Sequence, residues 1–164
     1  MKIAVVGLGF VGCVTATVLA DQGNEVIGLD IDSQKIKLLN SGKSPIFEPG
    51  LEELIKKNEK NLKFTTDYSL LSDSDVIFIS VPTPNENGKI DLNYVYSAIK
   101  SVALINKNAI IVIKSTVIPG TGTRMEKEFN VKIVSNPEFL REGNAIYDTM
   151  HPDRVVIGGD YEYS

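Results

Sequence analysis

The chain has 164 residues, a length that suits one domain with a sizeable hydrophobic core. Its 43% of hydrophobic and 23% of charged residues are typical of a soluble globular protein. The net charge of −4, from 17 basic and 21 acidic residues, argues against a nucleic-acid binder, which needs a basic face to neutralise phosphates. The one cysteine rules out an internal disulfide and fits a reducing, cytoplasmic compartment.

The first apolar stretch, residues 3–20, carries no charge and follows Lys2, as the start of a signal peptide or a membrane segment does. Gly7, Gly9 and Gly12 interrupt it at a particular spacing. We therefore expect no membrane segment here, and we interpret the stretch as the start of a soluble nucleotide-binding fold.

The spacing fits a strand, a glycine turn, a helix and a second strand in that order. Residues 2–6 form a short apolar run, typical of a strand that is buried on both faces. The sequence GLGFVG follows at once, and residues 10–23 have the pattern of a helix that ends at Gly23. Residues 25–30 are a second buried strand, which ends in an acid.

Each glycine has a distinct task in such a turn. Gly7 permits the tight turn, Gly9 lets the backbone approach a pyrophosphate, and Gly12 lets the helix pack closely on the strand. The helix N-terminus presents free N–H groups to the phosphates. Asp30 lies 18 positions after Gly12, where a carboxylate accepts both ribose hydroxyls and repels a 2′-phosphate. The pattern predicts dinucleotide binding, with NAD favoured over NADP.

Helices and strands alternate through the rest of the chain. This alternation predicts an α/β fold of Rossmann type, a doubly wound, mostly parallel sheet with helices on both faces. We expect further helices over residues 33–42, 49–60 and 91–105, and further strands over residues 62–66, 74–84, 109–116, 131–136 and 154–159.

Polar residues follow several of the predicted strands, where ligands of such sheets bind. Taken singly, each of these residues is as well explained by helix capping or by solvation. Glu138 and Glu142, four apart on one expected helical face, favour a functional role as proton acceptors. The residues expected to face one crevice are Asp30, Thr83, Thr116, Glu138, Arg141 and Glu142.

Six motifs together resemble the N-terminal domain of the UDP-glucose/GDP-mannose dehydrogenase family, over essentially the whole chain. They are GLGFVG, SPIFEPGLEEL, VPTP, KSTVIPGT, SNPEFLREGNAIYD and HPDRVVIGG, the last of which looks closest to the UDP-glucose 6-dehydrogenase branch.

The resemblance implies oxidation of the primary alcohol of a nucleotide-linked sugar to a carboxylate, for example of UDP-glucose to UDP-glucuronate. Two hydride transfers to NAD are needed. A cysteine thiolate traps the aldehyde as a thiohemiacetal, the second transfer gives a thioester, and water releases the acid.

The resemblance also implies roles for residues of this chain, and no metal. Thr116 would help to position a catalytic water, Glu138 would be the general acid/base of thioester hydrolysis, and Glu142 would lie between nicotinamide and substrate. The segment Glu138, Phe139, Leu140, Arg141 and Glu142 would contact the sugar. The expected NAD contacts are Gly7, Gly9, Val11, Gly12, Asp30, Lys35, Thr83, Thr116 and Glu142.

The chain departs from the family in one respect, because the family's nucleophilic cysteine lies in a later domain. Its substrate lysine and asparagine and its homodimer contact also come later. Cys13, in the first turn of the nucleotide helix, is better explained as a packed residue, and His151 as a loop residue. We therefore expect residues 1–164 to be a cofactor domain that is inactive in isolation.

Three alternatives stay open on the sequence alone. One is a dehydrogenase for another nucleotide sugar, such as GDP-mannose or UDP-N-acetylmannosamine. Another is a free-standing NAD-sensing module without catalysis. The third is a two-domain dehydrogenase of the hydroxyacid or glycerol-phosphate type.

Overall fold

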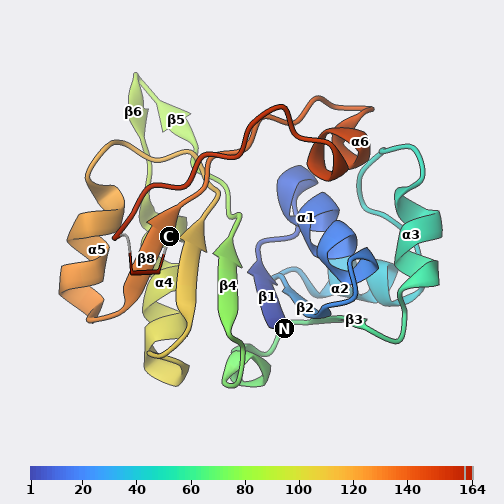
Figure 1. Cartoon of the computed structure of the whole chain (residues 1–164), viewed down its shortest axis with the longest axis horizontal. Helices are drawn as coiled ribbons and strands as arrows, with labels where there is room; N and C mark the ends of the chain where they lie inside the picture. The colour runs from blue at the N-terminus through green and yellow to red at the C-terminus, as the bar shows by residue number, and fades with distance from the viewer. Residues whose placement is uncertain (161, 164) are drawn as a thin grey trace.

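The computed structural model describes residues 1–160 and 162–163, and within them one sheet of six parallel strands dominates (Figure 1). In the strand order β3-β2-β1-β4-β7-β8, the chain first adds strands on one side of β1 and then, from β4 on, on the other side. This order confirms the predicted doubly wound Rossmann-type fold. The strands are β1 (Lys2–Val6), β2 (Glu25–Leu29), β3 (Leu62–Thr65), β4 (Val76–Ile79), β7 (Ile110–Ile113) and β8 (Lys132–Ser135).

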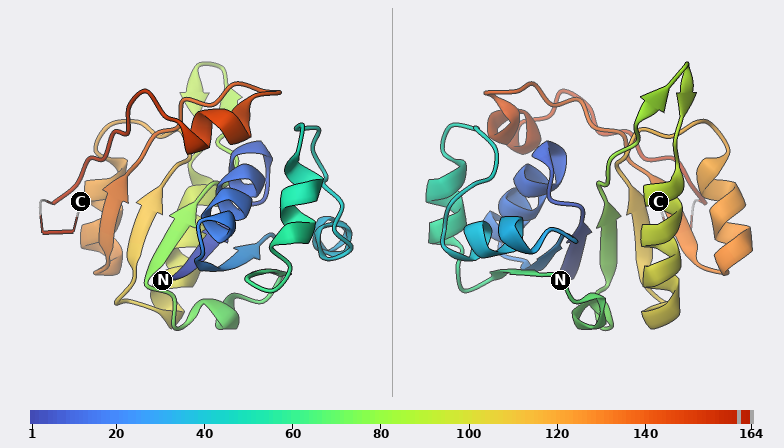
Figure 2. Two further views of the ribbon diagram at one scale, coloured as in Figure 1. Left: turned by 45° about the vertical axis from the view of Figure 1, so that its right-hand side comes forward. Right: turned by 180° about the vertical axis from the view of Figure 1, so that it is seen from behind.

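Helices cover both faces of the sheet, because alternate residues of the buried strands point to opposite sides. On β1, Ala4 and Val6 pack in a core with α4 (Asn93–Ile105) and α5 (Thr121–Phe129). Ile3 and Val5 pack in the other core with α1 (Phe10–Asp21), α2 (Ser33–Asn40) and α3 (Leu51–Lys57). Figure 1 shows α1 in front of the sheet, and the reverse view in Figure 2 shows α4 in front.

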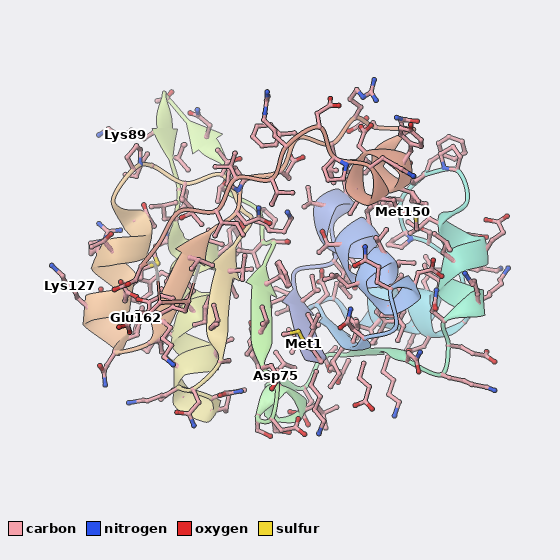
Figure 3. All side chains as sticks on the ribbon, in the orientation of Figure 1. Met1, Asp75, Lys89, Lys127, Met150 and Glu162 are labelled. Carbon is pink, nitrogen blue, oxygen red and sulfur yellow. The ribbon has the colours of Figure 1, made fainter. Side chains whose placement is uncertain are left out.

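The remaining elements lie mostly around the carboxyl edge of the sheet. Figure 3 shows Lys89 of the β5–β6 hairpin and Met150 of α6 at this edge, and Met1 and Asp75 at the opposite one. Of the helices in the described part of the chain, none is both long and apolar enough to cross a membrane. The additional elements are β5 (Asn85–Glu86), β6 (Lys89–Ile90), α6 (Ala145–Met150) and a 3-10 helix, η1 (Tyr68–Leu71).

The strand predicted over residues 154–159 is wrong. The segment makes one isolated antiparallel bridge, between Ser135 and Gly158, and Val155 is 64% exposed. The carbonyl of Val156 accepts a hydrogen bond from the Asn136 side chain and, among the described residues, none from the backbone of β8. An apolar run favours a strand only where a neighbouring strand takes up its backbone groups.

The four helices predicted by residue range are present in the described part of the chain but are shorter than expected at their ends. The prediction for residues 49–60 became α3, which begins after Gly50 in a left-handed conformation with φ of +81°. The prediction for residues 10–23 became α1, which ends at Asp21 and is followed by Gly23 with φ of +88°. The helices α5 and α6 and the β5–β6 hairpin were not expected from the sequence.

Candidate functional site

The turn between β1 and α1 leaves no room for a side chain at two of its glycines. Gly7 has φ of +91°, and a Cβ built there would lie 2.6 Å from the carbonyl oxygen of Ser80. A Cβ on Gly12 would lie 1.8 Å from the carbonyl oxygen of Gly7. At Gly9, by contrast, the described residues place nothing within 4 Å of such a Cβ. Gly7 and Gly12 therefore allow the turn to close, and space stays open at Gly9.

The N-terminus of α1 opens toward that space. Gly9 is its N-cap residue, and no side chain of the described residues caps the helix. The N–H groups of the first turn and the positive end of the helix dipole are therefore available to an anion. A phosphate group fits both the open space at Gly9 and these donors.

Asp30 follows β2 directly and is buried beside the glycine turn. Its carboxylate accepts hydrogen bonds from the backbone N–H of Leu8 (2.8 Å), from the Lys35 Nζ (2.6 Å) and from the backbone N–H of Asp32 (3.0 Å). Burial alone would raise the pKa of the Asp30 carboxyl, but these hydrogen bonds outweigh it and the pKa lies below its usual range. Asp30 is therefore ionised at neutral pH, and it both supports the turn and presents a negative charge.

A hollow of about 770 Å³ lies at the carboxyl ends of β1, β2, β4 and β7, and we call it the cofactor hollow. Gly12 does not line it, because this glycine lies against the Gly7 carbonyl. The residues predicted to contact NAD that line the hollow are Gly7, Gly9, Val11, Asp30, Lys35, Thr83 and Thr116.

Ser80 and Tyr68 are among the polar residues of this hollow that were not predicted from the sequence. Ser80 follows β4, and its buried Oγ has no hydrogen-bond partner among the described residues. Tyr68, at the start of η1, also lines the hollow, and burial followed by the charge of Asp30 raises the pKa of its phenol. Ser80 could have been found as the first polar residue after a buried strand. The unpartnered hydroxyl and the open space at Gly9 both fit a dinucleotide.

Residues 136–144, which we call the Glu138 loop, do not form the expected helix. The segment runs without regular structure to a turn at Gly143, whose φ is +79°, and α6 begins only at Ala145. Glu138 bends back so that its Oε2 accepts a hydrogen bond from the N–H of Leu140 (2.7 Å). The prediction that Glu138 and Glu142 share one helical face is therefore wrong.

A second hollow of about 590 Å³, the loop hollow, lies between the Glu138 loop, α1 and the segment after α6. Glu138, Phe139, Leu140 and Arg141 line it. Glu142 is exposed and, within the described residues, lines neither hollow. The structure thus brings together four of the five residues predicted to contact the sugar.

Lys114 and Glu138 line both hollows, and Lys114 was missed by the sequence analysis. Lys114 follows β7, and its Nζ donates a hydrogen bond to Asn136 Oδ1 (3.1 Å). Burial lowers the pKa of Lys114, and the charge of Glu138 opposes that shift. A basic residue just before Thr116, at the end of a buried strand, was the available signal. The two hollows therefore meet at a cation and a carboxylate.

The side chain of Arg141 is fixed by Asp148 of α6. Arg141 donates from Nη2 to Oδ1 (2.6 Å) and from Nε to Oδ2 (3.0 Å) of that carboxylate. The hydrogen bond from Arg141 is the main reason why the pKa of Asp148 is lowered to about 2. Beside this pair, the guanidinium of Arg154 lies 4.6 Å from the centre of the Phe139 ring. The Glu138 loop is thus held by the segments that follow it.

Two residues that the sequence analysis set aside are also placed by the structure. Cys13 is fully buried, its Sγ lies 3.2 Å from the Leu8 carbonyl oxygen, and burial raises the pKa of its thiol to about 12. A thiol of that pKa stays protonated at neutral pH and is a poor nucleophile. His151 follows α6 and stacks on Tyr147, with ring centres 4.5 Å apart.

The chain is similar in sequence to known proteins over its whole length. The sequence profile of the UDP-glucose/GDP-mannose dehydrogenase family, NAD binding domain, matches residues 1–164. The protein MJ1054 of Methanocaldococcus jannaschii is 49% identical over 166 residues, which cover 96% of this chain and 18% of MJ1054. UDP-glucose 6-dehydrogenase TuaD of Bacillus subtilis is 46% identical over 170 residues, which cover 96% of this chain and 37% of TuaD.

Solved structures agree with these sequence matches. GDP-mannose dehydrogenase from Pseudomonas aeruginosa, in a ternary complex, is 40% identical with a TM-score of 0.91, covering 99% of this chain and 42% of that protein. UDP-D-ManNAc dehydrogenase from Pyrococcus horikoshii is 34% identical with a TM-score of 0.90, covering 97% of this chain and 41% of that protein. The chain spans less than half the length of each of these four proteins.

Proposed function

Because the chain belongs to the UDP-glucose/GDP-mannose dehydrogenase family, we propose that it is the NAD-binding domain of an enzyme that oxidises UDP-glucose to UDP-glucuronate. The observation that carries the proposal is that the cofactor hollow and the loop hollow meet at Lys114 and Glu138. NAD, when bound, supplies the hydride acceptor. The other domains of such an enzyme contribute the nucleophilic cysteine, the remaining sugar contacts and the dimer interface.

On the cofactor side, the residues bind NAD and favour it over NADP. The open space at Gly9 and the N-terminus of α1 receive the pyrophosphate. Asp30 accepts hydrogen bonds from the ribose hydroxyls, and its negative charge disfavours a 2′-phosphate. Lys35 partly balances that charge through its 2.6 Å contact with the carboxylate, so the preference for NAD is a matter of degree.

On the sugar side, we assign Glu138 to proton transfer. Its side chain is half-buried and borders both hollows, so a sugar held in the loop hollow lies next to the Glu138 carboxylate. A carboxylate placed there can take a proton from the water that hydrolyses the thioester. Thr116 lines the cofactor hollow and orients that water, and the backbone of the Glu138 loop holds the sugar.

The identity of the nucleotide sugar is a separate part of this proposal. UDP-glucose is supported by TuaD at 46% identity, but the two solved structures carry other sugars in their names, GDP-mannose and UDP-D-ManNAc. Activity with these three nucleotide sugars, measured in an enzyme that joins this chain to the later domains of the family, separates the candidates. Two NADH formed for each UDP-glucose, with slower oxidation of the other sugars, is the result we expect.

A non-catalytic NAD sensor is the alternative from another class of protein. The isolated chain tests whether Cys13 is a packed residue or a nucleophile. If Cys13 is only packed, we expect the chain to bind NAD but to give no sustained NADH with UDP-glucose. Replacement of the buried thiol in Cys13→Ser should leave NAD affinity within about twofold, since the thiol lies below the glycine turn and faces the Leu8 carbonyl. Sustained NADH production that Cys13→Ser abolishes would show that the nucleophile is in this chain.

A further inference from the structure

Glu48 is a buried carboxylate in the connection between α2 and α3, far in sequence from the Glu138 loop. It is 7% exposed, whereas its neighbour Phe47 is 89% exposed. Its Oε2 accepts a hydrogen bond from the backbone N–H of Gly143 (2.8 Å), and its Oε1 accepts one from the N–H of Ala145 (2.8 Å). A charged group of this kind is buried only where donors satisfy it.

The N–H of Ala145 is one of the groups that a helix start leaves without an intrahelical partner, and Gly143 lies two residues before it. α6 begins at Ala145, and its N-cap residue Asn144 makes no side-chain cap. Glu48 takes that place from outside the helix, and the N–H of Ile146 lies at 3.5 Å from the same Oε1. The start of α6 is therefore capped by the first half of the domain.

Apolar contacts hold α6 and Leu140 of the loop against α1. Ala145 packs with Val14 and Val18 of α1, which holds α6 against the nucleotide helix. Gly143 belongs to the loop and has no side chain, so its backbone hydrogen bond to Glu48 joins the end of the loop to the connection between α2 and α3. Glu138 lies five residues before Gly143.

We infer that Glu48 is a positioning residue for the Glu138 loop, which sets where Glu138 lies between the two hollows. It acts by holding the N–H groups of Gly143 and Ala145, and so anchors the loop to the part of the domain that carries the glycine turn. The consequence for the sugar rests on the function proposed above, whereas the anchoring itself does not.

The test uses amide hydrogen exchange on the 164-residue chain and compares Glu48→Gln with Glu52→Gln. Glu52 is a matched control because its carboxylate accepts a hydrogen bond from the Ser44 N–H within the same connection. We expect Glu48→Gln to accelerate exchange in residues 138–146 at least tenfold. Exchange in β1, β4 and β7 and the Kd for NAD should stay within twofold, and Glu52→Gln should leave the loop unchanged.

Loop exchange within twofold of wild type in Glu48→Gln, or an equal acceleration throughout the sheet, would overturn the inference. Glu48→Asp, which keeps the charge on a shorter side chain, should restore part of the protection of the loop. In an enzyme joined to the later domains, Glu48→Gln should lower kcat at least tenfold and leave the KM for NAD within twofold. If the wild-type enzyme oxidised no nucleotide sugar, the proposed function would fail while the exchange result still decided the role of Glu48.

Discussion

The glycine turn lines the cofactor hollow and the Glu138 loop borders both hollows, yet contacts of different range determine their shapes. The turn is fixed mainly by residues within about one βαβ unit: Gly12 lies against the Gly7 carbonyl, and Asp30 accepts from Leu8 N–H. The Glu138 loop depends on carboxylates that come from outside it, Glu48 far upstream and Asp148 in α6. The shape of the glycine turn thus depends mostly on residues near it in the sequence, whereas the position of Glu138 depends on the assembled domain.

The largest effect is expected from replacing Glu138, the proposed proton acceptor. In an enzyme that joins this chain to the later domains, Glu138→Gln keeps the shape of the side chain and loses its basicity. We expect release of the acid to slow by about 100- to 10,000-fold, the contribution of a positioned general base, with the first oxidation less affected. Intact-protein mass spectrometry should show an accumulated acyl-enzyme.

Glu142→Gln is the matched control for that experiment, because Glu142 is exposed and lines neither hollow in the part of the chain that the structure describes. We expect it to change turnover less than Glu138→Gln does, with no acyl-enzyme. Normal turnover and no added mass in Glu138→Gln would make that residue an ordinary loop carboxylate.

On the cofactor side, two glycines should separate folding from binding. Gly12→Ala places a Cβ 1.8 Å from a backbone oxygen, so the free energy of unfolding should fall by about 3 kcal/mol or more. Gly9→Ala meets open space, so its stability should fall by about 1 kcal/mol or less, while NAD affinity falls. Urea denaturation and calorimetry measure the two quantities. Equal stability losses would contradict the assigned tasks.

A smaller effect is expected from neutralising Asp30. Asp30→Asn keeps one acceptor for the Leu8 N–H but loses the charge, and NAD binding should weaken by about 1–3 kcal/mol, the range for a charge-assisted hydrogen bond. Asp32→Asn is the control, because Asp32 caps α2 through the N–H groups of Gln34 and Lys35. It should reduce stability and leave the Kd for NAD within about twofold. Calorimetry showing equal losses of affinity in both variants would reject the role of Asp30.

The smallest effect is expected for the stability of the folded chain at low pH. The pKa of Asp148 is lowered from 3.8 to about 2 in the folded chain, so the unfolded chain binds its proton first as the pH falls. Its contribution to stability is therefore complete above pH 4 and is lost between pH 4 and pH 2. The difference in Tm between wild type and Asp148→Asn should shrink across that window. A constant difference from pH 5 to pH 2 would show that the pair with Arg141 contributes nothing to folding.

The range of these contacts explains what could be predicted from the sequence. The strand, turn and helix around Gly7 and Gly12, and Asp30 after β2, follow from local spacing, and the structure places them as that spacing indicates. The Glu138 loop looked helical because two carboxylates stand four apart. No local pattern shows that Glu138 bends back to Leu140 N–H or that a residue 95 positions upstream binds Gly143. The false strand at 154–159 has the same origin, because no local pattern shows that this segment meets β8 only at one bridge and through the Asn136 side chain.

Calorimetric titration of the 164-residue chain with NAD and with NADP shows whether the cofactor hollow binds NAD through the glycine turn and Asp30. We expect binding of NAD, weaker binding of NADP, and loss of most of this preference in Asp30→Asn, because the like charge that opposes the 2′-phosphate is then removed. Equal affinity of the wild-type chain for NAD and NADP, or no binding of NAD, would contradict it.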